Sequence, residues 1–219
     1  MKDIYNKIVD CQLFNGVSDI ERLLSNFDVI IKKYNKDEEI IGYGDNVKIL
    51  IVISGSLLTV SEDWQGNRNV ISHIGKSGIF GVAHVFSNSR STARVVCESD
   101  AEVAIIGIQK AYQDFLSQDY GKFIHNALLI VSNNCISFLE KVEHLSRRSM
   151  REKIISYLQA CRSKQSSDEF ELSFLRQDMA DYLAVDRSAL SAELSKMKKE
   201  GLIDYKKSWF KIKFNGLIK

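Results

Sequence analysis

Hydrophobic and polar positions along the 219-residue chain change their period twice. Between residues 28 and 108, short apolar runs alternate with glycine-containing segments, and the whole chain lacks proline. The runs rich in β-branched residues are 29–31, 49–53, 57–60, 70–71, 94–96 and 103–106. Many short strands at such spacing predict a β-sandwich or barrel. Two glycine-containing segments, 53–57 and 64–68, predict hairpin turns.

The segments on either side of this β-rich part have a helical period. Residues 1–26 predict short helices, and residues 119–146 predict one long helix. Its apolar side chains follow a 4-3 spacing over three heptads, typical of a coiled-coil seam. The seam consists of Ile124, Leu128, Val131, Cys135, Phe138 and Val142, and Leu145 continues it. Such a seam packs either on the protein's own β-rich part or against a second chain. We expect the second arrangement, and therefore a homodimer.

The C-terminal residues 147–219 contain a helix-turn-helix pattern. A helix over 147–162 and a polar loop precede it. Ala180 supplies the small residue where the two helices cross, and Asp186 is placed to cap the second helix through a backbone N–H. The segment 206–213 alternates basic and apolar residues. This order predicts a winged helix-turn-helix.

A helix-turn-helix of this kind places the outer face of its second helix in the major groove of double-stranded DNA. The residues expected to contact DNA are Arg176, Gln177, Asp186, Arg187, Ser188, Ala189, Ser191, Ala192, Ser195, Lys206 and Lys207. A helical hairpin with a charged surface is the simpler alternative. The small residue, the turn, the cap, the exposed arginine and serines and the basic hairpin nevertheless occur together, which favours DNA binding.

The distribution of charge agrees with this interpretation. Residues 1–144 hold 14 basic against 18 acidic side chains, a net charge of −4, whereas residues 145–219 hold 16 against 10, a net charge of +6. A basic C-terminal part on an acidic body suggests a polyanionic partner at that end.

Cysteine usage and hydropathy exclude several classes of protein. The four cysteines lie far apart without a C-x-x-C pair, so we expect buried free thiols and no metal centre. The chain has no run of eighteen apolar residues, and its first residues lack the apolar core of a signal peptide. We therefore expect a cytoplasmic protein with no membrane partner.

Several segments, in their order along the chain, resemble a known family. They are 53–57 (ISGSL), 78–81 (GIFG), 90–96 (RSTARVV), 186–191 (DRSALS) and 198–203 (KKEGLI). Over nearly its whole length the chain resembles the CRP/FNR family of bacterial transcription regulators. The resemblance implies an α+β fold with an antiparallel β-roll, which is a jelly-roll barrel, then a long dimerisation helix and a C-terminal winged helix-turn-helix. It further implies RNA polymerase as a partner.

The expected domains are an effector-sensing β-roll with short N-terminal helices at 1–118, a dimerisation helix at 119–146 and a DNA-binding domain at 147–219. The resemblance places the effector pocket at Gly81, Val82, His84, Arg90, Ser91, Thr92 and Ala93. In cyclic-AMP-binding members, Phe-Gly precedes a glutamate that accepts from the ribose 2′-hydroxyl, and an Arg-Ser pair holds the phosphate. Here Val82 follows Gly81, and the pair falls on either Arg90-Ser91 or Ser91-Thr92.

Valine cannot accept a hydrogen bond, and losing such a buried partner costs about 1–3 kcal/mol. We therefore expect an unidentified small effector other than cyclic AMP, or a pocket filled by the protein's own side chains. Iron–sulfur members carry an N-terminal cysteine cluster, whereas only Cys11 precedes Cys97 here. Haem-binding members need an axial ligand. His73 and His84 are available, both more typical of structural histidines, and His84 is the one near the expected pocket.

The recognition helix departs from the family as well. Many members begin it with Arg-Glu and carry another arginine one turn later, where this chain has Arg187-Ser188 and then Ala192. Arg187 is left as the strong base reader, since an arginine can grip guanine with two hydrogen bonds. Ala184 occupies a turn position where glycine is common, so a left-handed backbone there would be mildly strained.

Two other classes of protein remain as alternatives. A metal enzyme of the cupin type uses a similar barrel but needs two histidines one residue apart, and no H-x-H occurs here. A dimeric interaction module without a ligand is the second alternative. We expect no catalytic residues and no enzyme activity.

Overall fold

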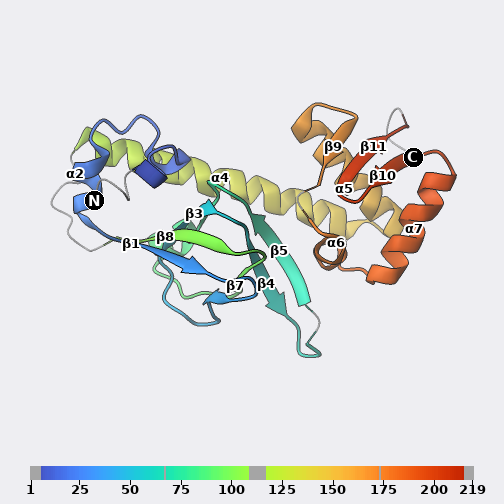
Figure 1. Ribbon diagram of the computed structural model, residues 1–219, viewed down its shortest axis with the longest axis horizontal. Helices are drawn as coiled ribbons and strands as arrows, with labels where there is room; N and C mark the ends of the chain where they lie inside the picture. The colour runs from blue at the N-terminus through green and yellow to red at the C-terminus, as the bar shows by residue number, and fades with distance from the viewer. Residues whose placement is uncertain (1–5, 67, 109–116, 173, 215–219) are drawn as a thin grey trace. The chain divides into compact units, whose positions relative to one another are not determined.

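A computed structural model of the protein describes residues 6–66, 68–108, 117–172 and 174–214 (Figure 1). The chain forms two compact units. The N-terminal unit consists of Met1–Glu62 and Ile71–Cys135, and the C-terminal unit of Asp63–Val70 and Ile136–Lys219. The fold class predicted from the sequence, β-sheets followed by a long helix and a small C-terminal αβ part, is confirmed.

Two four-stranded antiparallel sheets form the framework of the N-terminal unit. Their strand orders are β1-β8-β3-β6 and β2-β7-β4-β5. The strands are β1 (Phe27–Tyr34), β2 (Glu39–Ile41), β3 (Ile49–Ser54), β4 (Leu57–Glu62), β5 (Arg68–Ile74), β6 (Ile79–Phe80), β7 (Arg94–Cys97) and β8 (Ala101–Ile108). The helices of this unit include the 3-10 turn η1 (Gln12–Phe14), α2 (Ile20–Ser25) and α3 (Val82–Ser87). All six predicted runs lie within strands, whereas β2, β6 and α3 were not predicted.

One of the two predicted hairpins is wrong. The segment 53–57 joins β3 to β4, which belong to different sheets. Gly55 makes this crossing possible: its φ is +79°, and a Cβ there would lie 2.1 Å from the Asp100 carbonyl oxygen. The second predicted hairpin is confirmed, since β4 and β5 are neighbours in one sheet. Asn67 of that turn lies outside the described residues.

Both faces of the central strand β3 are buried, which explains its uninterrupted apolar sequence. Leu50 and Val52 face a cluster between the two sheets, with Leu57, Val95 and Val103 among its members. The alternate residues of β3 face a second cluster formed with the N-terminal helices and the first half of α4. Its members include Ile49, Ile51, Ala104, Ile106, Phe123, Ala127 and Ile130.

The long helix α4 (Gln118–Ser146) matches the predicted 119–146 and is followed by the rest of the C-terminal unit. The remaining elements are α5 (Met150–Gln165), β9 (Glu169–Glu171), α6 (Arg176–Leu183), α7 (Arg187–Lys199), β10 (Ile203–Lys206) and β11 (Trp209–Ile212). Strands β10, β11 and β9 form a small sheet in that order. The predicted helix at 147–162 begins later because Ser149 caps it. The Ser149 side chain accepts from the Glu152 backbone, and the Glu152 side chain accepts from the Ser149 backbone.

The cysteines agree only in part with the expectation of buried thiols. Cys11 and Cys97 are buried, and desolvation is the main cause that raises the pKa of each thiol to about 11. Cys161 is half-buried, whereas Cys135 is exposed on α4, contrary to the prediction. Among the described residues, no helix combines the length and apolar character that crossing a membrane requires.

Candidate nucleic-acid interface

The helix-turn-helix consists of α6, the turn 184–186 and α7. Met179, Ala180 and Leu183 of α6 are fully buried against Leu190 and Leu194 of α7, so the small residue lies in the shared core as predicted. Val185 is partly buried and packs against the same core. The spacing of these side chains fixes α7 on α6 and leaves the other side of α7 facing solvent.

The start of α7 is set by the predicted cap. Asp186 Oδ1 accepts from the backbone N–H of Ala189 at 2.8 Å and from the Ser188 hydroxyl at 2.5 Å. These two hydrogen bonds hold the pKa of the Asp186 carboxyl below its ordinary value, the bond from Ser188 being the larger cause. Asp186 therefore remains ionised at the positive end of the helix, where its charge is stabilising.

The turn residue Ala184 adopts the left-handed conformation, with φ +50° and ψ +58°. The left-handed backbone from which the strain was expected is therefore present. The Ala184 and Val185 backbone N–H groups donate to the carbonyls of Asp181 and Ala180, which close the C-terminal end of α6. The turn thus needs this backbone conformation, and alanine pays a steric cost to adopt it.

We predict that Ala184→Gly raises the free energy of unfolding by about 0.5–1 kcal/mol. Glycine removes about 1–2 kcal/mol of left-handed strain from the folded state. Part of this gain is offset because glycine gives the unfolded chain more conformational entropy. Urea unfolding followed by circular dichroism measures the difference. Ala192→Gly in the exposed helical part of α7 is the matched control and should lower stability by about 1 kcal/mol. A loss of stability in Ala184→Gly would contradict the strain.

The predicted DNA contacts on α7 and its cap divide into two groups by exposure. Asp186, Arg187, Ser188, Ala192 and Ser195 are exposed at the start and along the outer side of α7. Ala189 and Ser191 are half-buried. The serine hydroxyls turn back to their own helix: Ser191 donates to the Arg187 carbonyl at 3.0 Å and Ser195 to the Ser191 carbonyl at 2.8 Å.

The two predicted contacts at the start of α6 are engaged within the unit. The Arg176 guanidinium lies 5.2 Å from the ring centroids of Tyr205 and Phe210 and donates to the Lys207 carbonyl at 3.3 Å. Burial lowers the pKa of Arg176. Gln177 is exposed and donates to Asp181 at 2.7 Å. Arg176 therefore joins α6 to the wing, a role that its position in the motif did not reveal.

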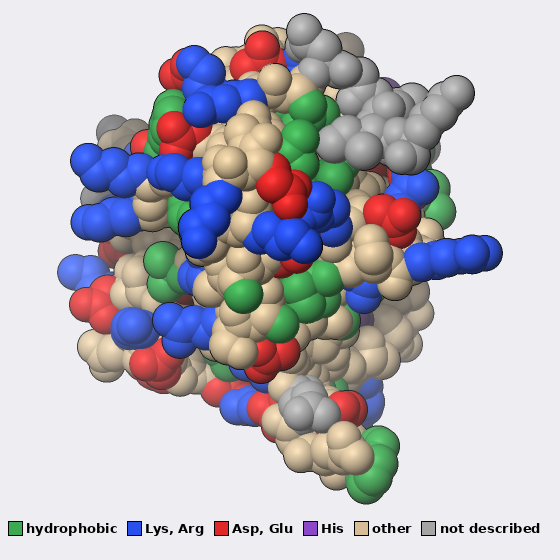
Figure 2. Space-filling view, turned by 90° about the vertical axis from the view of Figure 1, so that its right-hand side faces the viewer, with side chains coloured by type: hydrophobic (Ala, Val, Ile, Leu, Met, Phe, Trp, Pro, Cys, Tyr) green, Lys and Arg blue, Asp and Glu red, His purple; other side chains and the backbone are tan. Residues whose placement is uncertain are grey.

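The wing is the antiparallel hairpin of β10 and β11, with Lys206 opposite Trp209. Phe210 and Ile212 point into the core, whereas Lys206 and Lys207 are exposed. Lys207 has φ +55° at the turn. Basic side chains gather on the face of the molecule that Figure 2 shows, with acidic side chains among them. The exposed side of α7 and the basic wing together suit a polyanion with a groove.

The predicted seam of α4 is mostly uncovered. Leu128 and Val142 are each 63% exposed and Phe138 47%, and Cys135 is also exposed. The remaining seam residues, Ile124 and Val131, are partly buried against the N-terminal unit's own core. Exposed Ile136 and Leu139, which the heptad pattern did not include, widen this apolar face.

The residues expected to form an effector pocket do not share one surface. Val82 is 3% exposed and packs in the cluster with Ile49 and Phe123, not in the cluster between the sheets. Val82 is thus surrounded by apolar side chains. Its neighbour Gly81 has φ +93°, and a Cβ there would lie 2.4 Å from the Lys48 carbonyl oxygen. This turn starts α3 and rotates Val82 toward the helical cluster.

The other expected pocket residues lie in α3 and in the segment that follows it, and they differ in exposure. Arg90 is exposed and donates to the Gly44 carbonyl at 2.8 Å. Ser91 is buried, and its hydroxyl donates to the Ala93 carbonyl at 2.5 Å. Thr92 is exposed, and Ala93 is buried. His84 is half-buried with its ring centroid 5.5 Å from that of Phe80, and desolvation lowers its pKa.

Two parts of the chain match known domain families. Residues 31–119 match the cyclic nucleotide-binding domain family, and residues 152–214 match the Crp-like helix-turn-helix domain family. Electron transport regulator A of Shewanella oneidensis is 26% identical over 198 residues, which cover 84% of this chain and 76% of that protein.

Solved structures share the fold. The c-di-GMP-responsive global regulator CLP of Xanthomonas campestris aligns with a TM-score of 0.69 at 19% identity, covering 90% of this chain and 98% of its own. FixK2 of Bradyrhizobium japonicum aligns with a TM-score of 0.67 at 16% identity, covering 85% of this chain and 93% of its own.

Proposed function

We propose that this chain, which belongs to the CRP/FNR family of DNA-binding transcription regulators, binds a palindromic operator as a homodimer under the control of a small effector other than cyclic AMP. In this proposal residues 1–118 sense the effector, residues 119–146 dimerise and residues 147–219 bind DNA. RNA polymerase is the partner through which operator binding changes transcription.

The observation that best supports DNA binding is the arrangement of side chains at the start of α7. Asp186 caps the helix, and Arg187 follows at its first, exposed position. The N-terminal residues of a recognition helix are those that contact base edges in the major groove. Because Ser188 is engaged with Asp186, Arg187 is the strong donor available for a guanine. Lys206 and Lys207 of the wing supply charge for the flanking phosphates.

The palindrome follows from the proposed dimer. Two recognition helices related by a twofold axis meet successive major grooves on one side of the duplex, with half-sites about 34 Å apart. Selection of bound sequences from a random duplex library, followed by a mobility-shift assay on the selected sequence, tests the proposal. Recovery of an inverted repeat is the expected result. A purified protein that retains no sequence above the unselected background would contradict DNA binding itself.

The apolar interior of the N-terminal unit supports the proposal of an effector other than cyclic AMP. Apolar side chains from both sheets, including Leu50, Leu57 and Val95, pack against one another between the sheets. The side chain that replaces the family's ribose-binding glutamate, Val82, is buried in a different apolar cluster. The CLP regulator with the same fold responds to c-di-GMP, so this architecture serves effectors besides cyclic AMP. His84, in α3, is near the expected pocket.

We predict that the protein binds cyclic AMP with a dissociation constant well above the micromolar range. The ribose hydroxyl would lose its water without gaining the carboxylate that accepts from it in cyclic-AMP-binding relatives. Titration calorimetry of the full chain with cyclic AMP measures the affinity. A dissociation constant of about 1 μM or below, equivalent to about −8 kcal/mol, would contradict the prediction.

A further inference from the structure

Strand β5 crosses from one compact unit of the protein into the other. Its neighbours in the sheet belong to the N-terminal unit, yet residues 63–70 form one compact unit with residues 136–219. The turn between β4 and β5 and the first part of β5 are therefore part of the body that contains the helix-turn-helix. Nothing in the helix-turn-helix pattern itself points to this segment.

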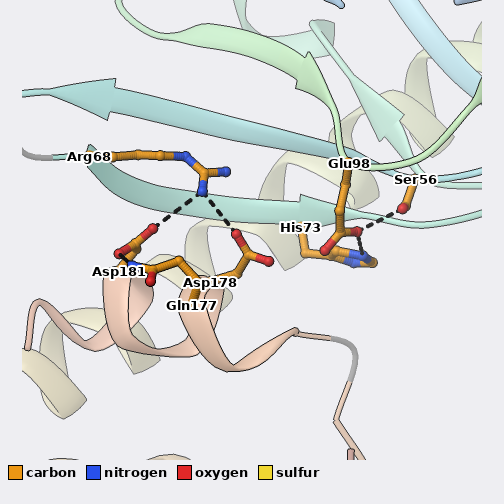
Figure 3. A network of polar contacts seen from close by, with 7 residues as sticks. All are labelled: Ser56, Arg68, His73, Glu98, Gln177, Asp178 and Asp181. Atoms are coloured by element: carbon orange, nitrogen blue, oxygen red, sulfur yellow. Dashed lines mark hydrogen bonds and ion pairs between the residues drawn. The ribbon is translucent and has the colours of Figure 1, made fainter. Parts of the chain in front are cut away.

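Arg68, the first residue of β5, holds two carboxylates of α6. Its Nη1 donates to Asp178 Oδ1 at 3.0 Å and to Asp181 Oδ2 at 3.3 Å (Figure 3). The Asp178 and Asp181 side chains are only 7% and 10% exposed. Two carboxylates one helical turn apart repel each other when buried, and a shared cation offsets that repulsion. Arg68 is thus placed to determine where this face of α6 lies.

A second cation joins the same elements. The Lys141 Nζ of α4 donates to the Val70 carbonyl of β5 and lies 4.6 Å from the ring centroid of Tyr182 on α6. Lys141 is 7% exposed, and its burial lowers the pKa of the ammonium to about 8. Residues 68 and 70 of one strand therefore contact α6 directly and through α4.

The position of α6 matters because α6 supports the recognition helix. Ala180 and Leu183 pack under Leu190 and Leu194 of α7, and Arg176 at the start of α6 contacts the aromatic rings of the wing. A displacement of α6 would move both DNA-contacting elements together. A close-packed interior transmits such a shift and does not absorb it.

The other end of β5 is held inside the N-terminal unit. His73 Nε2 lies 2.9 Å from Glu98 Oε2, which also accepts from the Ser56 hydroxyl at 2.7 Å (Figure 3). His73 follows Arg68 by five positions on the same strand. One short, hydrogen-bonded strand therefore carries a polar network of each unit.

We propose that Arg68 is a positioning residue for DNA binding: it fixes α6, and through α6 the recognition helix. This rests on the DNA binding proposed above. Arg68 acts here by neutralising Asp178 and Asp181, and it is not one of the residues expected to contact DNA.

Full-length variants test this role with two measurements. Arg68→Gln should lower affinity for the selected operator about tenfold and speed amide hydrogen exchange in α6. Arg68→Lys keeps the charge and should restore most of the affinity. Lys76→Gln, an exposed residue beyond the end of β5, removes the same charge and should change neither measurement.

A rescue variant separates positioning from direct DNA contact. Combining Arg68→Gln with Asp178→Asn and Asp181→Asn removes the carboxylates that need the cation, so operator affinity should return to within about threefold of the wild type. Triple-variant affinity as low as that of Arg68→Gln would assign Arg68 to phosphate contact and overturn the proposal. Unchanged or higher affinity in Arg68→Gln would also overturn it. Amide hydrogen exchange in α6 is measured without DNA. It therefore tests the positioning role of Arg68 even if the wild-type protein fails to bind DNA.

Discussion

A variant carrying Phe138→Asp and Val142→Asp should sediment as a monomer at micromolar concentration, where we expect the wild-type protein to be a dimer. Both side chains are largely exposed on α4 although they are apolar, and in a twofold interface each would face its own counterpart or a neighbour. The double substitution would bury four carboxylates without cations. We expect a loss of about 5 kcal/mol or more in dimer stability, nearly four powers of ten in the dissociation constant.

A matched control adds the same charge elsewhere on the helix. Asn133 and Ser137 are also exposed, and the 100° advance per residue of an α-helix puts them on the side away from the seam. Asn133→Asp with Ser137→Asp should therefore leave the sedimentation coefficient unchanged. A wild-type protein that sediments as a monomer would disprove dimerisation through α4, and a dimer in both double variants would move the interface elsewhere.

The sequence was sufficient for the helix-turn-helix because its determinants are local. Asp186 lies three residues before Ala189, whose backbone N–H it accepts from. Ala184 lies three residues after Asp181, and its backbone N–H donates to the Asp181 carbonyl. Such short-range hydrogen bonds depend little on the rest of the fold. The length of α4 was also predictable, because a 4-3 spacing sustained over three heptads fits few other structures.

Turn composition did not determine which strands pair. The glycine-containing segment at 53–57 has the residues of a hairpin turn, yet it carries the chain from one sheet to the other. The requirement at Gly55 comes from the Asp100 carbonyl, 45 positions further along the chain. The apolar surroundings of Val82 could not be predicted for a similar reason, because helix α3, which begins at Val82, was not predicted.

The contacts of the charged residues were beyond the reach of pattern analysis. Arg68 meets carboxylates 110 and 113 positions away, and no periodicity links a strand residue to a helix at that separation. Arg176 fitted the motif as a DNA contact but lies against Tyr205 and Phe210. A basic residue in a DNA-binding motif therefore carries little information about its role until its aromatic and acidic neighbours are known.

Arg187→Ala should weaken binding to the selected operator by about 1–3 kcal/mol and relax the preference at one base pair of each half-site. Arg187 is the first residue of α7 and is exposed beside the cap, the place from which a recognition helix reaches base edges. Fluorescence anisotropy on the operator, on single-base variants of it and on unrelated duplex measures the affinity and the preference together.

Comparison with Lys207→Ala distinguishes a base contact by Arg187 from a purely electrostatic contribution. Lys207 is exposed in the wing turn, so its loss should weaken all sequences similarly and reduce the salt slope of log affinity by about one. Both variants remove one positive charge, and a purely electrostatic role for Arg187 would make them behave alike. Only a base contact makes Arg187→Ala lose affinity for the operator while its binding to unrelated duplex stays nearly constant. Unchanged affinity and preference in Arg187→Ala would mean that a different part of α7 enters the groove.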